Sequence, residues 1–516
     1  MKYNLVLAAA LAGLMAAAMP AHAAEHGHAK GAHAPTAASA AIPQQRKVVT
    51  HGSVSIEGQT IHYTATAGTI LLHGKNGKPD GTMFYVAYTK DGAKAAHRPV
   101  TFLYNGGPGS SSIWLHMGGI GPYRVKVTNA GATPPAPYSI EPNHESLLND
   151  TDLVFIDAMG TGFSRVVGDG KYKQFWGVDQ DVRAFGQFIQ RYLSQNNRWN
   201  SPKFLYGESY GTTRSAALSE YLQQQGIALN GVILQSSILN YFIGSPGYDS
   251  NYTANLPSYA AIAWYHNKVP HTAASLEAFV QQAREFTDGA YSAALVQGDK
   301  LSKAQLDAVA QKMHAFTGLP VDYIERANLR VSPSAFRKQL LLPESKHMGR
   351  YDARYVGADR NANSSFPGFD PSDAYISPAF TAAFHWYLRN VLKYTSDHTY
   401  KVMNGQAIQQ WDWKHGYGSP EPDVATDLAS ALRQNPYLRV LSENGYFDLA
   451  TPFHGTEFDL DHMLLPPNLR DHVKLTYFKS GHMIYLNPKA LDAMHATLDA
   501  FYRHTLDVVD KAATPN

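Results

Sequence analysis

The stretch that decides the fold reads Phe204-Leu205-Tyr206-Gly207-Glu208-Ser209-Tyr210-Gly211. A short apolar run ends here in Gly-x-Ser-x-Gly, and residues 212–225 then carry apolar side chains at the spacing of one helix face. A strand, a glycine-flanked serine and a helix are the context of a nucleophile elbow, whereas the five-residue pattern alone also occurs in structural turns. Gly207 and Gly211 would let strand and helix approach, lifting Ser209 above the sheet near the positive end of the helix. We therefore predict that Ser209 is a nucleophile.

Length, charge and composition narrow the possible classes of protein. A chain of 516 residues can bury a large core, as two domains or as one domain with a large insertion. Its net charge of +2 gives no basic stripe, so we expect no nucleic-acid partner. The absence of cysteine excludes disulfides and thiolate nucleophiles, and no His-Glu-x-x-His motif occurs, so we expect neither a cofactor nor a catalytic metal.

The N-terminus has the features of an export signal. A lysine follows Met1, an apolar stretch covers residues 5–19, and Ala21-His22-Ala23 is a small-x-small cleavage site. We predict a signal peptide over residues 1–23. Residues 24–45 are rich in Ala, Gly, Pro and His without hydrophobic periodicity, which predicts a flexible leader. No later run of about 20 apolar residues follows, so we expect no membrane span and an exported protein, periplasmic or secreted.

Beyond the leader, strand-like apolar runs alternate with amphipathic helical segments. Residues 48–96 have the period-two pattern of strands joined by turns. Buried strands are then expected at the run that opens on Phe204 and at residues 99–104, 152–157, 231–235, 437–441 and 473–478. Helices are expected at residues 179–195, 212–225, 377–392 and 488–502. This alternation predicts a mostly parallel central sheet with helices on both faces.

Residues 240–372 interrupt the alternation. They are polar, with helical stretches at residues 273–285, 303–316 and 332–341 and no obvious buried strand. We predict a mainly helical insertion, or cap, over the active edge of the sheet, where it would shape the substrate pocket. An independent helical domain is the alternative. The core would then consist of residues 46–239 and 373–516.

Two further strand ends carry candidate catalytic side chains. Asp448 follows a predicted strand, and His482 lies between the last strand and the final helix. A serine hydroxyl needs a base to take its proton during attack, and a histidine oriented by a carboxylate supplies that base. We predict that Ser209, Asp448 and His482 form a triad in that chain order. Glu443 and Asp459 are rival acids that lie less cleanly beyond a strand end.

A glycine-rich loop, Asn105-Gly106-Gly107-Pro108-Gly109, follows the strand at residues 99–104. Such a loop must fold its backbone tightly, and its N–H groups then point at a ligand. A phosphate cradle is conceivable, but the lysine of a P-loop is missing. An oxyanion site fits better, because enzymes with a nucleophile elbow take one of their two oxyanion-hole amides from this kind of loop.

Together these residues resemble the serine carboxypeptidase family of α/β-hydrolases, over about residues 99–488. Five motifs in the family's order carry the resemblance and are far more specific than any single one. They are Asn105-Gly-Gly-Pro-Gly-Ser-Ser-Ser112, Gly160-Thr-Gly-Phe-Ser164, Gly207-Glu-Ser-Tyr-Gly211, Gly445-Tyr-Phe-Asp-Leu-Ala-Thr-Pro452 and Gly481-His-Met-Ile484. With its predicted signal peptide, the chain looks like an exported member of the bacterial type.

The resemblance implies an α/β-hydrolase fold and cleavage of a peptide substrate at its free C-terminus through an acyl-enzyme. It places the oxyanion hole at the backbone amides of Gly107 and Tyr210. It assigns the substrate's terminal carboxylate to Asn105, the Gly106 amide and Glu208. Glu208 can donate a hydrogen bond only when it is protonated, which would favour weakly acidic working conditions.

Two departures from the family's pattern bear on the carboxylate subsite. The family pairs the glutamate at the position of Glu208 with a second glutamate, and the matching position here is Gly119. The family's tryptophan before the glycine loop is replaced by Leu103. A paired acid shares its proton and stays neutral to higher pH, so an acid optimum depends on what takes the partner's place. His116 and Arg124 are the candidates.

Two rival functions fit the same residues. A serine esterase or acyltransferase would use the same triad, and an acyltransferase would pass the acyl group to an alcohol. An exported binding protein with an inactive site is the rival outside the enzymes, and the presence of the whole triad and both oxyanion loops disfavours it. The sequence indicates no oligomeric state.

Overall fold

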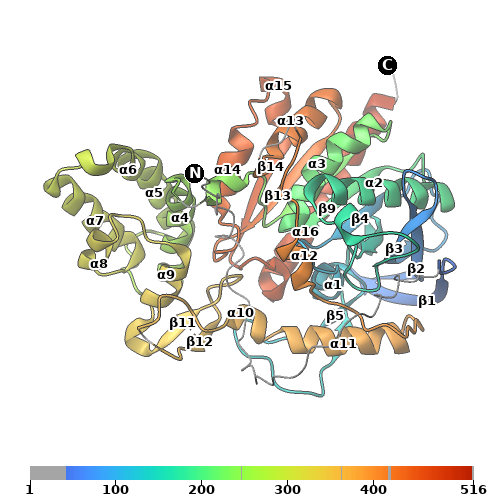
Figure 1. Cartoon of the computed structure of the whole chain (residues 1–516), viewed down its shortest axis with the longest axis horizontal. Coiled ribbons are helices and arrows are strands. Elements are labelled where there is room, and N and C mark those ends of the chain that lie inside the picture. The colour runs from blue at the N-terminus through green and yellow to red at the C-terminus, as the bar shows by residue number, and fades with distance from the viewer. Residues whose placement is uncertain (1–41, 246, 362, 417–419, 514–516) are drawn as a thin grey trace, which may run out of the picture.

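The computed structural model describes residues 42–245, 247–361, 363–416 and 420–513. The predicted signal peptide, residues 1–23, and residues 24–41 of the predicted leader lie outside the described residues. Figure 1 shows two parts, a large sheet covered by helices and a lobe of helices that stands to the left of it. The lobe is formed by residues from the predicted insertion, and the sheet by the chain on either side of it.

A ten-stranded mixed sheet forms the centre of the larger part, in the order β1-β2-β3-β7-β4-β9-β10-β13-β14, with β8 paired to β3. The first three strands are antiparallel, as is the pairing of β3 with β7, and every pairing from β7 to β14 is parallel. The strands are β1 Lys47–Ile56, β2 Gln59–His73, β3 Pro79–Lys90, β4 Val100–Tyr104, β7 Asp152–Ile156, β8 Arg165–Val166, β9 Lys203–Glu208, β10 Gly231–Gln235, β13 Arg439–Gly445 and β14 Val473–Phe478. The predicted parallel core is confirmed, except that β13 extends four residues beyond the predicted strand, to Gly445.

Successive side chains of the parallel strands enter two different apolar cores, because a strand presents alternate residues to opposite faces. Leu205 of β9 packs in the core under one set of helices, whereas its neighbours Phe204 and Tyr206 pack in the other. The first set of helices is α2 Val178–Gln195, α3 Tyr210–Gln224 and α13 Ala425–Gln434; the second includes α1 Ile113–Leu115, α11 Ser377–Asn390 and α16 Pro488–Ala513. Helices on both faces are therefore confirmed.

Short elements complete the larger part around its loops. They are α10 Pro371–Ala374, α12 Gly405–Gln409, α14 Phe453–Asp461, α15 Pro467–Arg470 and the two-stranded sheet of β5 Tyr123–Val125 with β6 Ile140–Pro142. Helix α14 packs against the lobe, so it joins the two parts.

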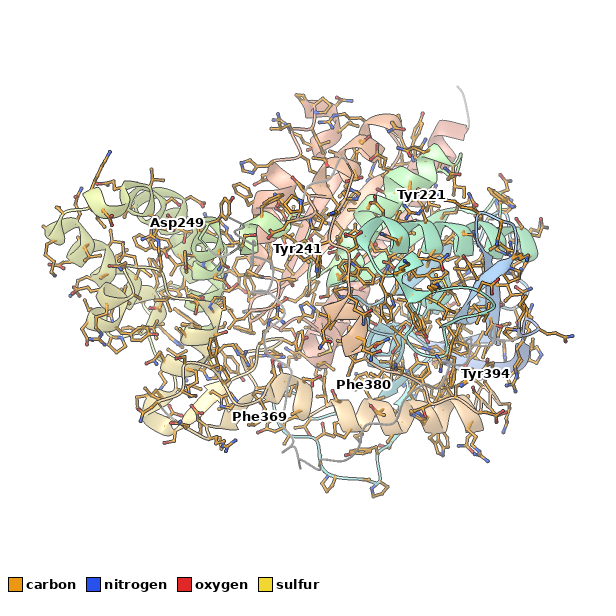
Figure 2. The ribbon with its side chains drawn as sticks, in the orientation of Figure 1. Tyr221, Tyr241, Asp249, Phe369, Phe380 and Tyr394 are labelled. Atoms are coloured by element: carbon orange, nitrogen blue, oxygen red, sulfur yellow. The ribbon has the colours of Figure 1, made fainter. Side chains whose placement is uncertain are left out.

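The lobe has an apolar core of its own. Its helices are α4 Ser250–Tyr265, α5 Leu276–Phe286, α6 Ser292–Gln297, α7 Lys303–Thr317, α8 Val321–Arg326 and α9 Pro333–Gln339. The sequence analysis did not predict α4, because this helix buries residues around most of its circumference and so lacks an amphipathic period. It also did not predict the small antiparallel pair β11 Lys346–Met348 and β12 Val356–Ala358. Figure 2 places Asp249 in this lobe and Tyr241 between the lobe and the sheet.

The amino end of the parallel strands is held by a buried cluster of charges. Asp152 opens β7 and accepts hydrogen bonds from Arg98 Nε at 3.1 Å and Arg198 Nη1 at 2.5 Å. All three residues are at most 8% exposed. One carboxylate thus pairs with two buried guanidinium groups.

Replacing Asp152→Ala leaves both cations buried without their carboxylate, and we expect the free energy of unfolding to fall by about 3–5 kcal/mol. Urea denaturation followed by tryptophan fluorescence measures this change. The control is Asp307→Ala, which removes an exposed partner of Lys303 and should change stability little. Equal effects of the two substitutions would contradict the role of the buried cluster.

Candidate active site

Ser209 stands on a tight turn between β9 and α3. Its backbone has φ 62° and ψ −130°, a left-handed conformation that non-glycine residues seldom adopt outside functional turns. A Cβ atom on Gly207 would lie 2.1 Å from the carbonyl oxygen of Gly211, so the predicted need for glycine at the strand–helix approach is confirmed at Gly207. The Ser209 hydroxyl caps no helix N–H, and the residue is partly exposed. The nucleophile candidate is therefore presented to solvent at the amino end of a helix.

Asp448 and His482 are brought together by a short hydrogen bond. His482 Nδ1 lies 2.7 Å from Asp448 Oδ2, and both residues are at most 3% exposed. The other carboxylate oxygen of Asp448 accepts the backbone amides of Ala450 at 2.7 Å and Thr451 at 3.1 Å, which fixes its orientation. Burial lowers the pKa of the His482 imidazole, but the Asp448 charge and hydrogen bond outweigh it, so this pKa is raised. An Nδ1–H bound to Asp448 leaves Nε2 as the basic nitrogen.

The backbone of His482 is tied to the residues beside Ser209. Its carbonyl oxygen accepts the Ser236 hydroxyl at 2.6 Å and Gln235 Nε2 at 3.3 Å. Gln235 in turn accepts the Ser209 amide at 3.0 Å through its own carbonyl. Within the described residues no hydrogen bond joins the Ser209 hydroxyl to the His482 ring. The structure therefore joins Asp448 to His482 directly and brings Ser209 next to them through β10.

A segment that leaves the lobe crosses the loops of both Asp448 and His482. The Tyr351 carbonyl accepts the His482 amide at 2.6 Å, and the Arg350 carbonyl accepts the Leu449 amide at 3.0 Å. A Cβ on Gly481 would lie 2.5 Å from the Tyr351 oxygen, so the two segments are in close contact. Sequence reasoning missed this contact, because no local signal in residues 350–354 indicates which loop they meet.

The two predicted oxyanion amides come from facing loops. Gly107 has φ 109° and is exposed, and Tyr210 is the first residue of α3. Neither backbone N–H donates a hydrogen bond to any of the residues that the structure describes. Gly106 packs so closely that a Cβ there would lie 2.3 Å from the Tyr210 nitrogen. Two unpartnered donors, one on the glycine loop and one at the start of α3, are what an oxyanion hole requires.

The Gly160–Ser164 motif supports the glycine loop and does not reach the catalytic side chains. Asp157, just before it, accepts the Ser112 amide and hydroxyl, each at 2.9 Å, and the Tyr400 hydroxyl at 3.0 Å. Asn404 donates to the Gly160 carbonyl at 2.9 Å. The segment after α11 thereby clamps both motifs together.

The Glu208 carboxylate is buried and receives three donors. Asn105 Nδ2 lies 2.8 Å from Oε1, and Oε2 accepts Gln235 Nε2 at 2.9 Å and the Tyr485 hydroxyl at 2.8 Å. Burial raises the pKa of Glu208 to about 7, although the nearby His482 charge and the hydrogen bonds from Tyr485 and Asn105 act in the opposite direction. The raised pKa favours the protonated form of Glu208 in weakly acidic solution. Asn105 also accepts the Leu115 amide at 3.1 Å.

Tyr485 fills the space next to Gly119, where the family carries its second glutamate. A Cβ on Gly119 would lie 2.6 Å from Tyr485 Cβ, and one on Gly118 would lie 2.2 Å from the ring. The two compensating residues considered from sequence are engaged elsewhere: His116 Nε2 is 2.6 Å from the Tyr88 hydroxyl, and Arg124 pairs with Glu141 at 2.8 Å. The phenol of Tyr485 thus bonds Glu208 at the place where the resemblance puts a second acid. Leu103, at the position of the family's tryptophan, is fully buried in the sheet.

The rival acids do not reach His482. Glu443 lies inside β13, and its carboxylate meets the Tyr206 hydroxyl at 2.9 Å. Asp459 accepts the backbone amides of Leu239 and Asn240 at 3.3 and 3.1 Å. Asp448 is thus the carboxylate that the structure places on the histidine.

Sequence reasoning missed Gln235, Tyr206 and Tyr485 as members of the site. Gln235 did carry a signal, since a glutamine ends an otherwise apolar buried strand. Across the described residues, no helix is long and apolar enough to cross a membrane, and no group of three or more His, Asp or Glu side chains is placed to hold a metal ion.

Comparisons with known proteins concern the fold and the family of the chain. A solved structure of Kex1(delta)p, a prohormone-processing carboxypeptidase from Saccharomyces cerevisiae, superposes with a TM-score of 0.53 at 15% identity, covering 86% of this chain and 91% of that one. The predicted α/β-hydrolase fold is confirmed. In sequence, the pheromone-processing carboxypeptidase kex1 of Neosartorya fischeri is 27% identical over 161 residues, which are 31% of this chain and 23% of that protein.

The match to that curated relative thus spans about a quarter of the relative's length. A far larger part of the chain is matched by a family model: residues 65–471 fit the model of the serine carboxypeptidases. This chain therefore belongs to the serine carboxypeptidase family.

Proposed function

We propose that this protein is a serine-type carboxypeptidase that cleaves the last peptide bond of substrates with a free C-terminus. Ser209 would act as nucleophile, His482 as base and Asp448 as the group that orients the base. The observation that carries the proposal is the buried 2.7 Å hydrogen bond from His482 to Asp448, beside a strained serine turn, in a chain of this family.

In the proposed reaction, His482 Nε2 takes the Ser209 proton as the serine oxygen attacks the carbonyl carbon. The oxyanion forms against the Gly107 and Tyr210 amides, and one such donor typically contributes about 2.7–4 kcal/mol to lowering the barrier. The imidazolium then gives its proton to the departing amine, which leaves an acyl-enzyme on Ser209. Water, deprotonated by His482, attacks the ester and restores the hydroxyl.

Recognition of the substrate's terminal carboxylate is proposed for Asn105, the Gly106 amide and Glu208. Asn105 Nδ2 carries a second N–H besides the one given to Glu208. Glu208, with a pKa near 7, carries a proton below neutral pH and can then donate to the carboxylate. Ionised Glu208 would repel it. Membership of the family thus supports exopeptidase action. The burial of Glu208 supports a pH dependence of carboxylate binding.

The proposal also covers the location of the protein and the roles of its two parts. The chain would be an exported member of the bacterial type, periplasmic or secreted, on the strength of the signal-like residues 1–23. Residues 240–372 would act as the cap, and residues 46–239 and 373–516 as the catalytic core. The contact of Tyr351 with the His482 loop supports a cap that bears on the active edge.

A peptide blocked at its N-terminus, with a free C-terminal carboxylate, should be hydrolysed by the enzyme through Ser209. The same peptide with a C-terminal amide should show a kcat/KM about a hundredfold lower, because it leaves polar groups of the carboxylate subsite unpaired and this is costly. Mass spectrometry of the products measures both rates. Ser209→Ala should abolish hydrolysis and labelling by a fluorophosphonate. Equal cleavage of acid and amide would contradict the proposal, and cleavage of esters without peptides would favour the esterase alternative.

Glu208→Gln should remove an alkaline limb from the pH profile on peptide acids. In the wild type kcat/KM for a peptide acid should fall about tenfold per pH unit above about pH 7, because Glu208 loses its proton there. A neutral glutamine does not titrate, so the profile of Glu208→Gln should stay level between about pH 7 and pH 8, where the wild-type rate already falls. An ester substrate without a carboxylate is the control and should show no such difference between the two enzymes. An unchanged peptide profile would remove Glu208 from carboxylate binding.

A further inference from the structure

Four polar side chains form a buried row at the carboxyl end of the parallel strands. Gln235 of β10 pairs in register with Glu208 of β9 on one side and with Glu443 of β13 on the other. Asn105 continues the row beyond Glu208, because it follows β4, the other neighbour of β9. All four residues are at most 3% exposed. The hydrogen bonds that they make therefore come from one another and from their immediate neighbours.

The orientation of the Gln235 amide is fixed by its neighbours. Nε2 lies 2.9 Å from the Glu208 carboxylate and 3.3 Å from the His482 carbonyl oxygen. A carbonyl oxygen only accepts hydrogen bonds, so the NH2 group must face this pair. The amide oxygen then points the other way, 2.8 Å from the Tyr206 hydroxyl, and requires a donor there.

The Tyr206 hydroxyl has one proton and two candidate acceptors. Its oxygen lies 2.8 Å from Gln235 Oε1 and 2.9 Å from Glu443 Oε2. Because Gln235 Oε1 has to receive the phenol proton, the Glu443 oxygen facing Tyr206 has to be a donor itself. An ionised Glu443 would compete for the Tyr206 proton. If Glu443 took it, the lone pairs of the Tyr206 oxygen and of Gln235 Oε1 would face each other without a proton between them. A protonated Glu443 is the state in which both oxygens that face the Tyr206 hydroxyl are satisfied.

The surroundings of Glu443 agree with a neutral side chain. The residue is fully buried, its Oε1 has no hydrogen-bond partner, and it forms no ion pair in the described part of the chain. Burial raises its pKa to about 8, and the Tyr206 hydroxyl is the group that acts in the opposite direction. The groups facing it are Tyr206 from β9, Gln235 from β10 and Tyr502 from α16, whose own pKa is raised partly by Glu443.

We propose that neutral Glu443 is a positioning residue for the proposed hydrolytic reaction, in which it directs a one-way chain of hydrogen bonds through Tyr206 and Gln235 to Glu208 and the His482 backbone. Glu443 donates to Tyr206, Tyr206 donates to Gln235, and Gln235 donates to both targets. Glu443 does not touch substrate. The inference rests on the proposed function only for its effect on rate, since the protonation of Glu443 is a property of the folded chain.

The proposal makes activity sensitive to alkaline pH even for substrates that lack a carboxylate. When Glu443 loses its proton, the carboxylate takes the Tyr206 hydrogen bond and Gln235 Oε1 loses its donor, so the amide holds His482 and Glu208 less firmly. The folded-state pKa lies above the ordinary value of 4.5, so the stability gained from neutral Glu443 is complete below pH 4.5 and is lost as pH rises through about 8.

The test compares wild type with E443Q and Y206F on a nitrophenyl ester across neutral and alkaline pH. Wild-type kcat/KM should fall to a lower plateau above about pH 8. E443Q keeps a neutral donor and should stay level over that range. Y206F cannot donate to Gln235 and should lie about tenfold lower at neutral pH, without an alkaline limb. Y104F is the matched control, since Tyr104 is equally buried on the neighbouring strand and, among the described residues, its hydroxyl bonds Ser215 alone.

Two readouts need no turnover. The infrared difference spectrum of wild type minus E443Q at neutral pH should contain the carbonyl band of a protonated carboxylic acid, and the difference in their unfolding free energy should change between pH 4.5 and about 8. An alkaline limb that persists in E443Q, Y206F activity equal to Y104F, or no acid band would overturn the inference. Failure of Ser209 to react with any substrate or fluorophosphonate would overturn the proposed function, while the infrared and stability results would still decide the state of Glu443.

Discussion

The parallel pairing of β4, β9, β10, β13 and β14 is the constraint on which the rest of this structure depends. Parallel neighbours end at the same edge of a sheet, so residues far apart in sequence arrive at one place with fixed relative heights. The Ser209 turn, the Asp448 loop and the His482 loop each follow one of these strands. The same register sets Glu208, Gln235 and Glu443 side by side just below that rim.

Below the rim, the site is built from neutral donors around buried carboxyl groups. Glu208 receives an asparagine, a glutamine and a tyrosine, and no arginine or lysine pairs with it in the described chain. Burial without a cation disfavours the charged form, which is why the pKa of Glu208 and that of Glu443 both rise. The hydrogen bonds of Asp448 come from two backbone amides, a threonine hydroxyl and His482. One edge of the sheet thus holds acids in contrasting environments.

The lobe contributes backbone contacts to the catalytic edge. Its returning segment accepts the His482 amide on Tyr351 and the Leu449 amide on Arg350, so the loops of histidine and aspartate rest on the same support. On the other side, residues after α11 bind the glycine loop and the Gly160 loop through Asn404. Asn404 reaches the Gly160 carbonyl through its side chain, whereas the contacts of Tyr351 and Arg350 act between loop backbones and place few demands on side-chain identity. They therefore leave little trace in the sequence.

Local patterns in the sequence determined the elements of the core, the elbow at Ser209 and the order of the triad candidates, because strand periodicity and glycine requirements depend on near neighbours only. They also identified the family through its five motifs. The bond between Asp448 and His482, and the part played by Gln235, Tyr206 and Tyr485, were decided only by the tertiary structure. Those contacts depend on strand register and on how α16 and its preceding turn pack against Gly118 and Gly119. Register is set by the whole sheet at once, and no stretch of sequence contains it.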